Sequence, residues 1–191
     1  MLRSCGMWSG FFHRRRARAK RSMGNRRDTT MSAVEIRIAT DCDLESLAES
    51  HAPGISAAQI ERRLEESRKG FRTMLVAVKE GRAVGCVSIG GGRFQRRDSL
   101  RLFSLDVGPT FRRNGVGTAL VKAVEAIAAE SGMDEVNLEV EIDNEDATRL
   151  YRRLGYRMCG DAVMDRWTRL EDDGSCETIE VPVFVMVKRL V

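Results

Sequence analysis

The first segment with residues suited to chemistry is a short basic turn that contains two glycines. It reads Arg112, Arg113, Asn114, Gly115, Val116, Gly117 and Thr118, after an apolar run typical of a strand and before one typical of a helix. The first amides of a helix lack intrahelical partners and carry about half a positive charge. Glycines leave such amides uncovered and the guanidinium groups add charge, so the turn is suited to a pyrophosphate. A plain loop before a core helix is the alternative.

Two common phosphate loops do not fit this turn. A P-loop requires Gly-Lys followed by Ser or Thr, whereas Gly117 is followed by Thr118 and an alanine. A dinucleotide fingerprint requires a third glycine where this chain has Leu120. The turn therefore predicts an anion site of another kind.

A second segment, residues 135–156, carries candidates for proton transfer. Alternation places Glu139 on the polar face of a strand, where a solvated carboxylate is the alternative to a catalytic base. Tyr151 has helical spacing to apolar residues, so it is either a core tyrosine or a proton donor. Asn144 immediately precedes that helix and is suited to be its N-cap. Asp106, at the end of an earlier strand, is a second carboxylate.

The elements that must position these residues follow a regular pattern from about residue 34. The apolar pattern predicts strands at 34–39, 73–78, 83–89, 99–107, 135–142, 156–159 and 179–188, and helices at 41–50, 56–69, 115–131 and 145–154. Asp41 is the predicted cap of the first helix. Early hairpins followed by a β-α-β-α-β half predict an α/β fold, with a mixed, mostly antiparallel sheet and flanking helices.

Length and charge divide the chain into two parts. The 191 residues correspond to one domain, which we place at 31–191. Residues 1–30 hold nine of the 32 basic and one of the 28 acidic residues, so the remainder carries 23 bases against 27 acids. A mildly acidic domain argues against nucleic acid as its partner. No apolar run reaches the roughly 18 residues that a membrane span requires.

Residues 1–30 form a basic leader without clear periodicity, which we expect to be disordered or to lie upstream of the true start, with Met23 and Met31 as alternative starts. Contact with nucleic acid or a membrane, and targeting, are its other interpretations. The five cysteines are scattered and never form a C-x-x-C pair, which argues against a disulfide framework or a metal site and favours a cytoplasmic location.

Two motifs together carry a family resemblance over about residues 34–156. The basic turn reads Arg-x-x-Gly-x-Gly from Arg112 to Gly117. The second signature comprises Asn144, Ala147, Leu150, Tyr151, Gly155 and Tyr156. Both resemble the GCN5-related N-acetyltransferase (GNAT) family, and the run 138–140 is similar to its ribosomal-protein alanine N-acetyltransferase branch. The resemblance implies the GNAT fold, with the fourth and fifth strands splayed to admit acetyl-CoA as co-substrate.

The resemblance also implies roles for the candidate residues. The pyrophosphate would lie on the turn from Arg112 to Thr118, and Asn144 would hold the pantetheine arm. The backbone around Asp106, at Leu105 and Val107, would pair with the pantetheine amides and polarise the thioester. Tyr151 would be the general acid to the CoA sulfur. Glu139 would be the base, through water, with Asp106 as the second candidate.

The acceptor is predicted less closely than the co-substrate. Residues 161–178 look like an acidic insert with Trp167 in it, which favours a cationic primary amine, either a small molecule or a protein N-terminus, although a solvated loop is the alternative. No cysteine lies in either motif, which favours direct transfer. A non-catalytic acyl-CoA-binding module and nucleic-acid binding through the leader are the rival functions. The oligomeric state is left open, a homodimer included.

Overall fold

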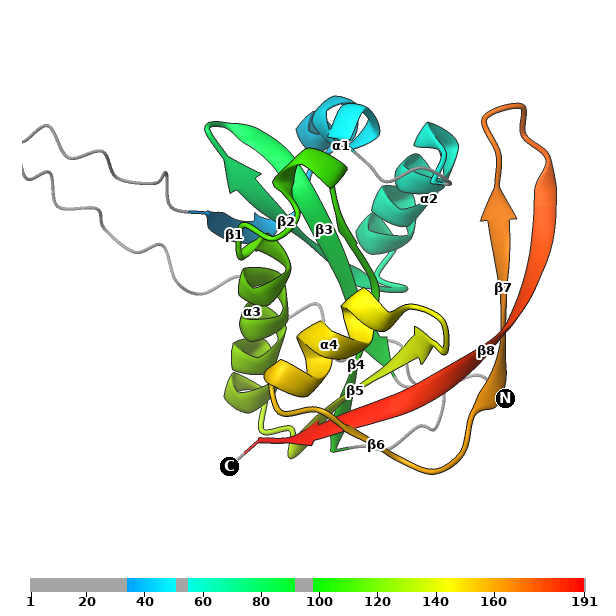
Figure 1. Cartoon of the computed structure of the whole chain (residues 1–191). Helices are drawn as coiled ribbons and strands as arrows, with labels where there is room; N and C mark the ends of the chain where they lie inside the picture. The colour runs from blue at the N-terminus through cyan, green and yellow to red at the C-terminus, as the bar shows by residue number, and fades with distance from the viewer. Residues whose placement is uncertain (1–33, 51–54, 92–97, 191) are drawn as a thin grey trace, which may run out of the picture.

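One mixed sheet organises the part of the chain that the computed structural model describes, residues 34–50, 55–91 and 98–190. Its strand order is β1-β2-β3-β4-β5-β8-β6, with β7 paired to β8 (Figure 1). Neighbouring strands are antiparallel except β4 and β5, which are parallel. The predicted α/β class with a mostly antiparallel sheet is confirmed.

Except for β7, which was not predicted, the elements follow the predicted order with small shifts at their ends. They are β1 (Glu35–Ile38), α1 (Leu44–Ser50), α2 (Ala57–Arg68), β2 (Thr73–Lys79), β3 (Arg82–Gly91), β4 (Ser99–Val107), α3 (Val116–Glu130), β5 (Glu135–Glu141), α4 (Glu145–Arg153), β6 (Arg157–Met158), β7 (Val163–Leu170) and β8 (Cys176–Arg189). Short 3-10 turns, Asp41–Asp43 and Pro109–Phe111, precede α1 and follow β4. The leader 1–30 lies outside the described residues.

Helices cover the two faces of the sheet unequally (Figure 1). On one face α3 and α4 pack over the centre of the sheet, where Leu120 and Tyr151 join Leu102 and Leu138 in the larger apolar core. On the other face α1 and α2 pack near β1 to β3 in a second, smaller core. Beyond α2, the polar side chains of β4 and β5 occupy that second face.

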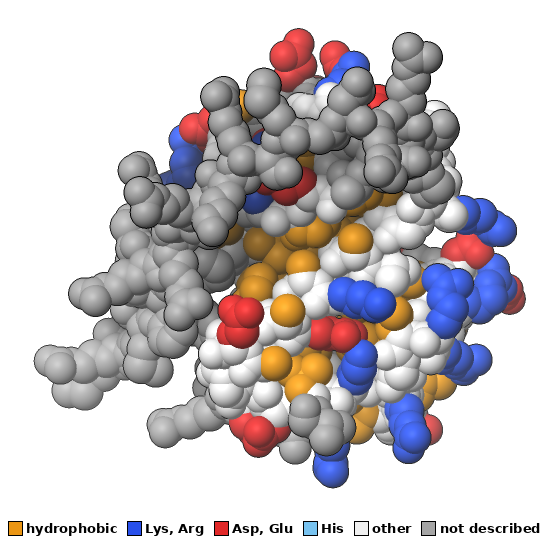
Figure 2. Space-filling model, turned by 90° about the vertical axis from the view of Figure 1, so that its left-hand side faces the viewer, with side chains coloured by type: hydrophobic (Ala, Val, Ile, Leu, Met, Phe, Trp, Pro, Cys, Tyr) orange, Lys and Arg blue, Asp and Glu red, His pale blue; other side chains and the backbone are white. Residues whose placement is uncertain are grey.

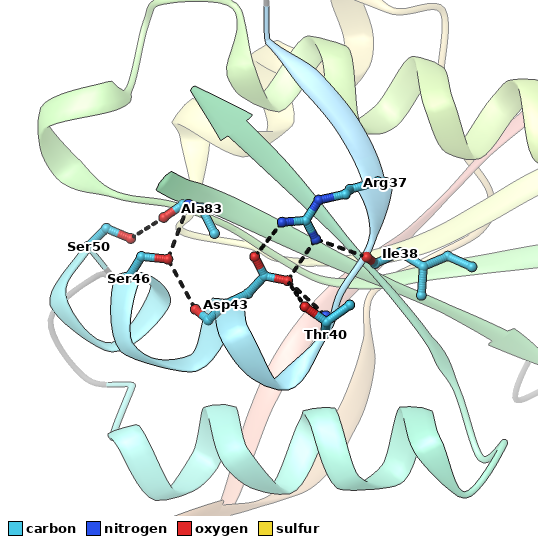
Figure 3. A network of polar contacts seen from close by, with 7 residues as sticks. All are labelled: Arg37, Ile38, Thr40, Asp43, Ser46, Ser50 and Ala83. Atoms are coloured by element: carbon cyan, nitrogen blue, oxygen red, sulfur yellow. Dashed lines mark hydrogen bonds and ion pairs between the residues drawn. The ribbon is translucent and has the colours of Figure 1, made fainter. Parts of the chain in front are cut away.

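A polar network anchors the start of α1 to the sheet (Figure 3). The Asp43 carboxylate accepts hydrogen bonds from the Arg37 guanidinium at 2.7 and 2.8 Å and from the amide and hydroxyl of Thr40. Burial disfavours the carboxylate, but these bonds outweigh it and hold the pKa of Asp43 below its ordinary value. The cap is therefore Thr40, and the prediction of Asp41 was wrong, because the carboxylate that closes the capping box is Asp43.

The stretch 161–178, where no strand was predicted, belongs to a β-hairpin: β7 was missed, and β8 begins at Cys176 instead of residue 179. β7 pairs with β8 from Val163↔Val183 to Leu170↔Cys176. Charged residues occur along both strands, and exposed cross-strand ion pairs such as Arg169 with Glu177 (3.3 Å) replace an apolar face. The hairpin also contacts α2, since the Leu170 amide donates to the Gln59 side chain at 2.8 Å. Alternate residues of β7, such as Asp165 and Arg169, are half-buried, but their charged side chains hide the apolar alternation that reveals a strand.

Candidate active site

β4 and β5 pair at one end and separate at the other. Their register runs from Ser99↔Glu135 to Leu102↔Leu138, although the strands continue to Val107 and Glu141. Past this point β4 pairs with β3 and β5 pairs with β8. The predicted splay is confirmed, and two strand edges face each other there without a shared ladder.

A β-bulge in β4 lies just beyond this separation. Ser104 has a φ of 52°, and the register with β3 shifts between Cys86↔Asp106 and Ser88↔Phe103. The Gly108 amide donates to the Val84 carbonyl at 3.0 Å. Because bonded and non-bonded pairs alternate in an antiparallel ladder, the main-chain groups of Asp106 point to β3. Those of Leu105 and Val107 then point toward β5, into the gap.

The basic turn connects the end of β4 to the exposed N-terminus of α3. The first helical bond runs from the Ala119 amide to the Gly115 carbonyl at 2.9 Å. The amides of Val116, Gly117 and Thr118 precede it, at the end of the helix that carries positive partial charge. Arg112, Arg113 and Asn114 are exposed beside them. The Arg112 Nε donates to the Val107 carbonyl at 3.1 Å, which ties the turn to the edge of the gap.

The two glycines of the turn are favoured at their positions for different structural reasons. Gly115 is the N-cap of α3 with a φ of 82°, a left-handed conformation that L side chains rarely adopt. At Gly117 a Cβ would lie 3.4 Å from the Leu150 Cδ2 and 3.8 Å from the Val107 Cγ2. Gly115 therefore permits the turn, whereas Gly117 lies where α3, α4 and β4 approach one another closely.

α4 holds two candidates, one exposed and one buried. The Asn144 side chain accepts a hydrogen bond from the Ala147 amide at 3.1 Å, so its predicted role as N-cap is confirmed. Tyr151 is buried in the larger core and meets Tyr156 edge to face, with ring centroids 5.7 Å apart. Burial raises the pKa of Tyr151 well above its ordinary value of 10, so the phenol keeps its proton at neutral pH.

Positive charge collects on the side of the molecule that carries α4. Figure 2 shows the face with α3, and the Lys and Arg side chains gather along its right-hand margin, which is the front of Figure 1. Arg152 and Arg153 belong to the last turn of α4. Arg113 lies 3.5 Å from Asp146 at the other end of that helix.

Glu139 lies on the opposite face of the sheet from Tyr151 and is not solvated. Only 6% of its side chain is exposed, and its Oε2 accepts from the Arg101 Nε at 2.9 Å. Its Oε1 is buried and has no hydrogen-bond partner among the described residues. The alternative of a solvated strand carboxylate is therefore wrong, because Arg101 and the surrounding structure enclose the group.

Sequence reasoning missed the aromatic and basic side chains beside Glu139. The Arg101 guanidinium lies 4.8 Å from the centre of the Phe103 ring, and the Arg72 guanidinium lies 4.9 Å from the same centre. Arg72 is in turn paired with Glu66 of α2 and donates to the Ser88 hydroxyl at 3.2 Å. The alternation of β4 placed Arg101 and Phe103 on one face, but no motif marked them.

Asp106 faces α2. Its Oδ2 lies 3.9 Å from the Arg63 Nη1, and 13% of its side chain is exposed. The neighbouring Cys86 is buried, and burial raises the pKa of its thiol to about 12. The thiol is therefore protonated at neutral pH and is a poor nucleophile.

The Acetyltransferase (GNAT) family model matches residues 41–156. The chain therefore belongs to the GNAT family, as its two motifs predicted. It is 43% identical to N-alpha-acetyltransferase 30 of Homo sapiens over 61 residues, which are 32% of this chain and 16% of that protein. It is 36% identical to the mycothiol acetyltransferase of Clavibacter sepedonicus over 94 residues, 48% of this chain and 28% of that protein. The chain spans less than a third of either relative.

Solved structures share the fold over most of the chain. Ard1 from Thermoplasma volcanium is 26% identical with a TM-score of 0.59, covering 83% of this chain and 99% of that one. The ribosomal-protein-alanine N-acetyltransferase from Brucella melitensis is 24% identical with a TM-score of 0.60, covering 82% and 99%. A phosphinothricin acetyltransferase from Sinorhizobium meliloti, solved with acetyl-CoA, is 19% identical with a TM-score of 0.61, covering 82% and 88%. None of the helices described here is long and apolar enough to span a bilayer.

Proposed function

We propose that this protein is an acetyl-CoA-dependent N-acetyltransferase that transfers the acetyl group directly to a primary amine. The observation that carries the proposal is the gap between β4 and β5, which joins the open N-terminus of α3 to the buried carboxylate of Glu139. A linear thioester with a charged diphosphate at one end and a reactive group at the other matches such a gap. Membership of the GNAT family supports the same chemistry.

The diphosphate would be held by the turn that precedes α3. The amides of Val116, Gly117 and Thr118 would donate to its oxygens, in the manner of other helix N-termini that bind phosphate. Arg112, Arg113 and Asn114, exposed beside those amides, would add charge and hydrogen bonds. The basic margin near α4 supports the approach of such an anion.

The pantetheine arm would take the place of the missing strand neighbour. The main-chain groups of Leu105 and Val107, which point toward β5, would pair with its amides and polarise the thioester carbonyl. Asp106 would line this stretch through its main chain. Asn144, at the other side of the gap, would meet the arm while it caps α4, since an amide side chain has both a donor and an acceptor.

The reaction requires two proton movements besides acyl transfer. A bond forms between the amine nitrogen and the acetyl carbon, and the bond from that carbon to sulfur breaks. Glu139 would accept the proton that the amine loses, directly or through water, with Asp106 as the alternative base. Tyr151, protonated at neutral pH, would donate to the leaving thiolate. Direct transfer is favoured because the Cys86 thiol is protonated, and Cys159 and Cys176 lie on the exposed strands and turns beyond α4.

A protein N-terminus and a small amine both remain acceptors under this proposal. N-alpha-acetyltransferase 30 and the ribosomal-protein-alanine enzyme are named for protein substrates, and mycothiol acetyltransferase is named for a small one. The hairpin of β7 and β8 beside α2 is the acidic region that would attract a cationic acceptor. We propose a cytoplasmic enzyme, and the mildly acidic charge of residues 31–191 argues against nucleic acid as its substrate.

Calorimetry with CoA, followed by a thiol-release assay with acetyl-CoA and a panel of amines, tests the proposal. The panel includes peptides with varied N-termini, a polyamine and an amino acid. We expect CoA binding and turnover of at least one primary amine. Binding without turnover of any acceptor would favour a non-catalytic acyl-CoA-binding module, and absence of CoA binding would refute both.

A further inference from the structure

Arg101 and Glu139 form a partly buried ion pair across the last bonded residues of β4 and β5. Arg101 is in register with Asn137, so its side chain reaches two residues along β5 to Glu139. The Nε to Oε2 distance is 2.9 Å, and 19% and 6% of the two side chains are exposed. A buried carboxylate keeps its charge at tolerable cost only beside a compensating cation. Arg101 therefore lies as a compensating cation beside Glu139 and fixes the orientation of its carboxylate.

Arg101 is itself held in place. Its guanidinium stacks on the Phe103 ring, and the Arg72 guanidinium lies at a similar distance from the same ring. Arg72 is held by an ion pair with Glu66 and a hydrogen bond to Ser88. Stacking of this kind favours the planar guanidinium over an ammonium. The result is a chain of contacts from α2 through Arg72, which precedes β2, and through β4 to β5, with the carboxylate of Glu139 at its end.

The two oxygens of Glu139 have different surroundings. Oε2 accepts a hydrogen bond from Arg101, whereas Oε1 is buried without a hydrogen-bond partner among the described residues. Buried acceptors in native proteins almost always have a donor from protein, water or ligand. The N–H of an acceptor amine is a suitable donor for Oε1, and so is the O–H of one bridging water.

We propose that Arg101 is a positioning residue for proton transfer, which holds Oε2 of Glu139 so that Oε1 faces the acceptor amine. This inference rests on the proposed acetyltransferase function. As the C–N bond forms and the C–S bond breaks, the proton leaves the amine nitrogen for Oε1, directly or through one water. The sulfur takes a proton from Tyr151, and both groups return to their starting states by exchange with solvent.

A double-mutant cycle in the full chain tests this role. The variants are Arg101→Gln, Glu139→Gln and the double variant, assayed with acetyl-CoA and the best acceptor from the panel. Loss of a general base costs about 10²–10⁴ in rate, and we expect Arg101→Gln to lower kcat at least tenfold. The double variant should be no slower than Glu139→Gln, because Arg101 acts through Glu139. Wild-type kcat in Arg101→Gln, or losses that multiply in the double variant, would overturn the proposal.

Further measurements separate positioning from folding. CoA affinity by calorimetry should change less than twofold in every variant, since Arg101 is on the face away from the turn. Arg82→Gln, which removes an exposed pair with Glu49, is the matched control and should keep full activity. If Arg101→Gln does not fold, Arg101→Lys keeps the charge in place. Its kcat should be lowered, and the loss should disappear in the Glu139→Gln background; a loss that persists there would refute the role.

An inactive wild type is a separate outcome from failure of the cycle. If the wild-type protein binds no CoA or turns over no amine, the proposed function fails and the ion pair is structural. If the wild type is active and Glu139→Gln is as fast as the wild type, the proton acceptor is another group. In that case the role of Arg101 is refuted while the transferase function stands.

Discussion

The two ends of the gap between β4 and β5 are lined by different kinds of chemical groups. At the α3 end, where we propose that the diphosphate binds, the available groups are main-chain amides in an exposed turn, with arginines around them. At the Glu139 end they are buried side chains that several strands and α2 bring together. An exposed turn is a local property of a few consecutive residues, whereas a buried cluster depends on the register of the whole sheet. The two ends should therefore respond differently to substitution.

Removal of the Tyr151 hydroxyl should have the largest effect on catalysis. We expect Tyr151→Phe to lower kcat about 10²–10⁴-fold, because the leaving thiolate loses its proton donor. The ring remains, so CoA affinity should hold. Tyr156→Phe is the matched control, since Tyr156 is also buried and its pKa is also raised by burial. Steady-state kinetics of Tyr151→Phe and Tyr156→Phe distinguishes the two roles. Equal losses of kcat in both variants would mean that Tyr151 contributes only to packing.

Asp43→Asn should lower stability without touching either end of the gap. Hydrogen bonds from Arg37 and Thr40 hold the pKa of Asp43 down, so its stabilisation is complete at neutral pH and lost as the pH falls below about 3.8. We expect the variant to lose about 1–3 kcal/mol at pH 7. Urea unfolding at a series of pH values should show the two proteins converging in acid. A constant difference across that range would contradict the pairing.

The two glycines separate a conformational role from a ligand-contact role. Gly117→Ala adds a Cβ at ordinary contact distance from Leu150, so stability should hold while CoA affinity falls about tenfold, or about 1.4 kcal/mol. Gly115→Ala meets no neighbour but forces alanine into the left-handed region, which costs about 1–2 kcal/mol of stability. Thermal melts and calorimetry on both variants check this. If Gly117→Ala keeps full CoA affinity, the diphosphate does not bind beside Gly117.

Arg113→Ala should have the smallest effect. Its side chain is 85% exposed and already lies 3.5 Å from Asp146, so water and a competing carboxylate weaken its attraction for phosphate. Exposed charge pairs contribute about 0.2–1 kcal/mol. We expect CoA affinity to fall less than fivefold, and the difference from wild type to vanish in high salt. A larger loss that persists in salt would indicate direct, buried contact with the ligand.

Prediction from sequence succeeded where a few neighbouring residues carry the information. The turn from Arg112 to Thr118, the cap at Asn144 and the family itself were visible because local motifs specify them. Strand β7 was missed because charged residues such as Asp165 and Arg169 lie on its half-buried face and hide the apolar alternation, whereas most of β8 was predicted at 179–188. The first helix cap was misplaced by one residue, at Asp41 instead of Thr40, because either side chain is suited to cap a helix in isolation.

The sequence by itself determined the fold class, the glycine-containing basic turn before α3 and the residue types that we propose for proton transfer. Only the tertiary structure decided that Glu139 is buried, that Arg101 holds one of its oxygens, and that Phe103 supports both arginines. The reason is the range of the interactions. A helix N-terminus forms from consecutive residues, whereas a buried ion pair across parallel strands joins residues 38 positions apart, whose register the whole sheet sets.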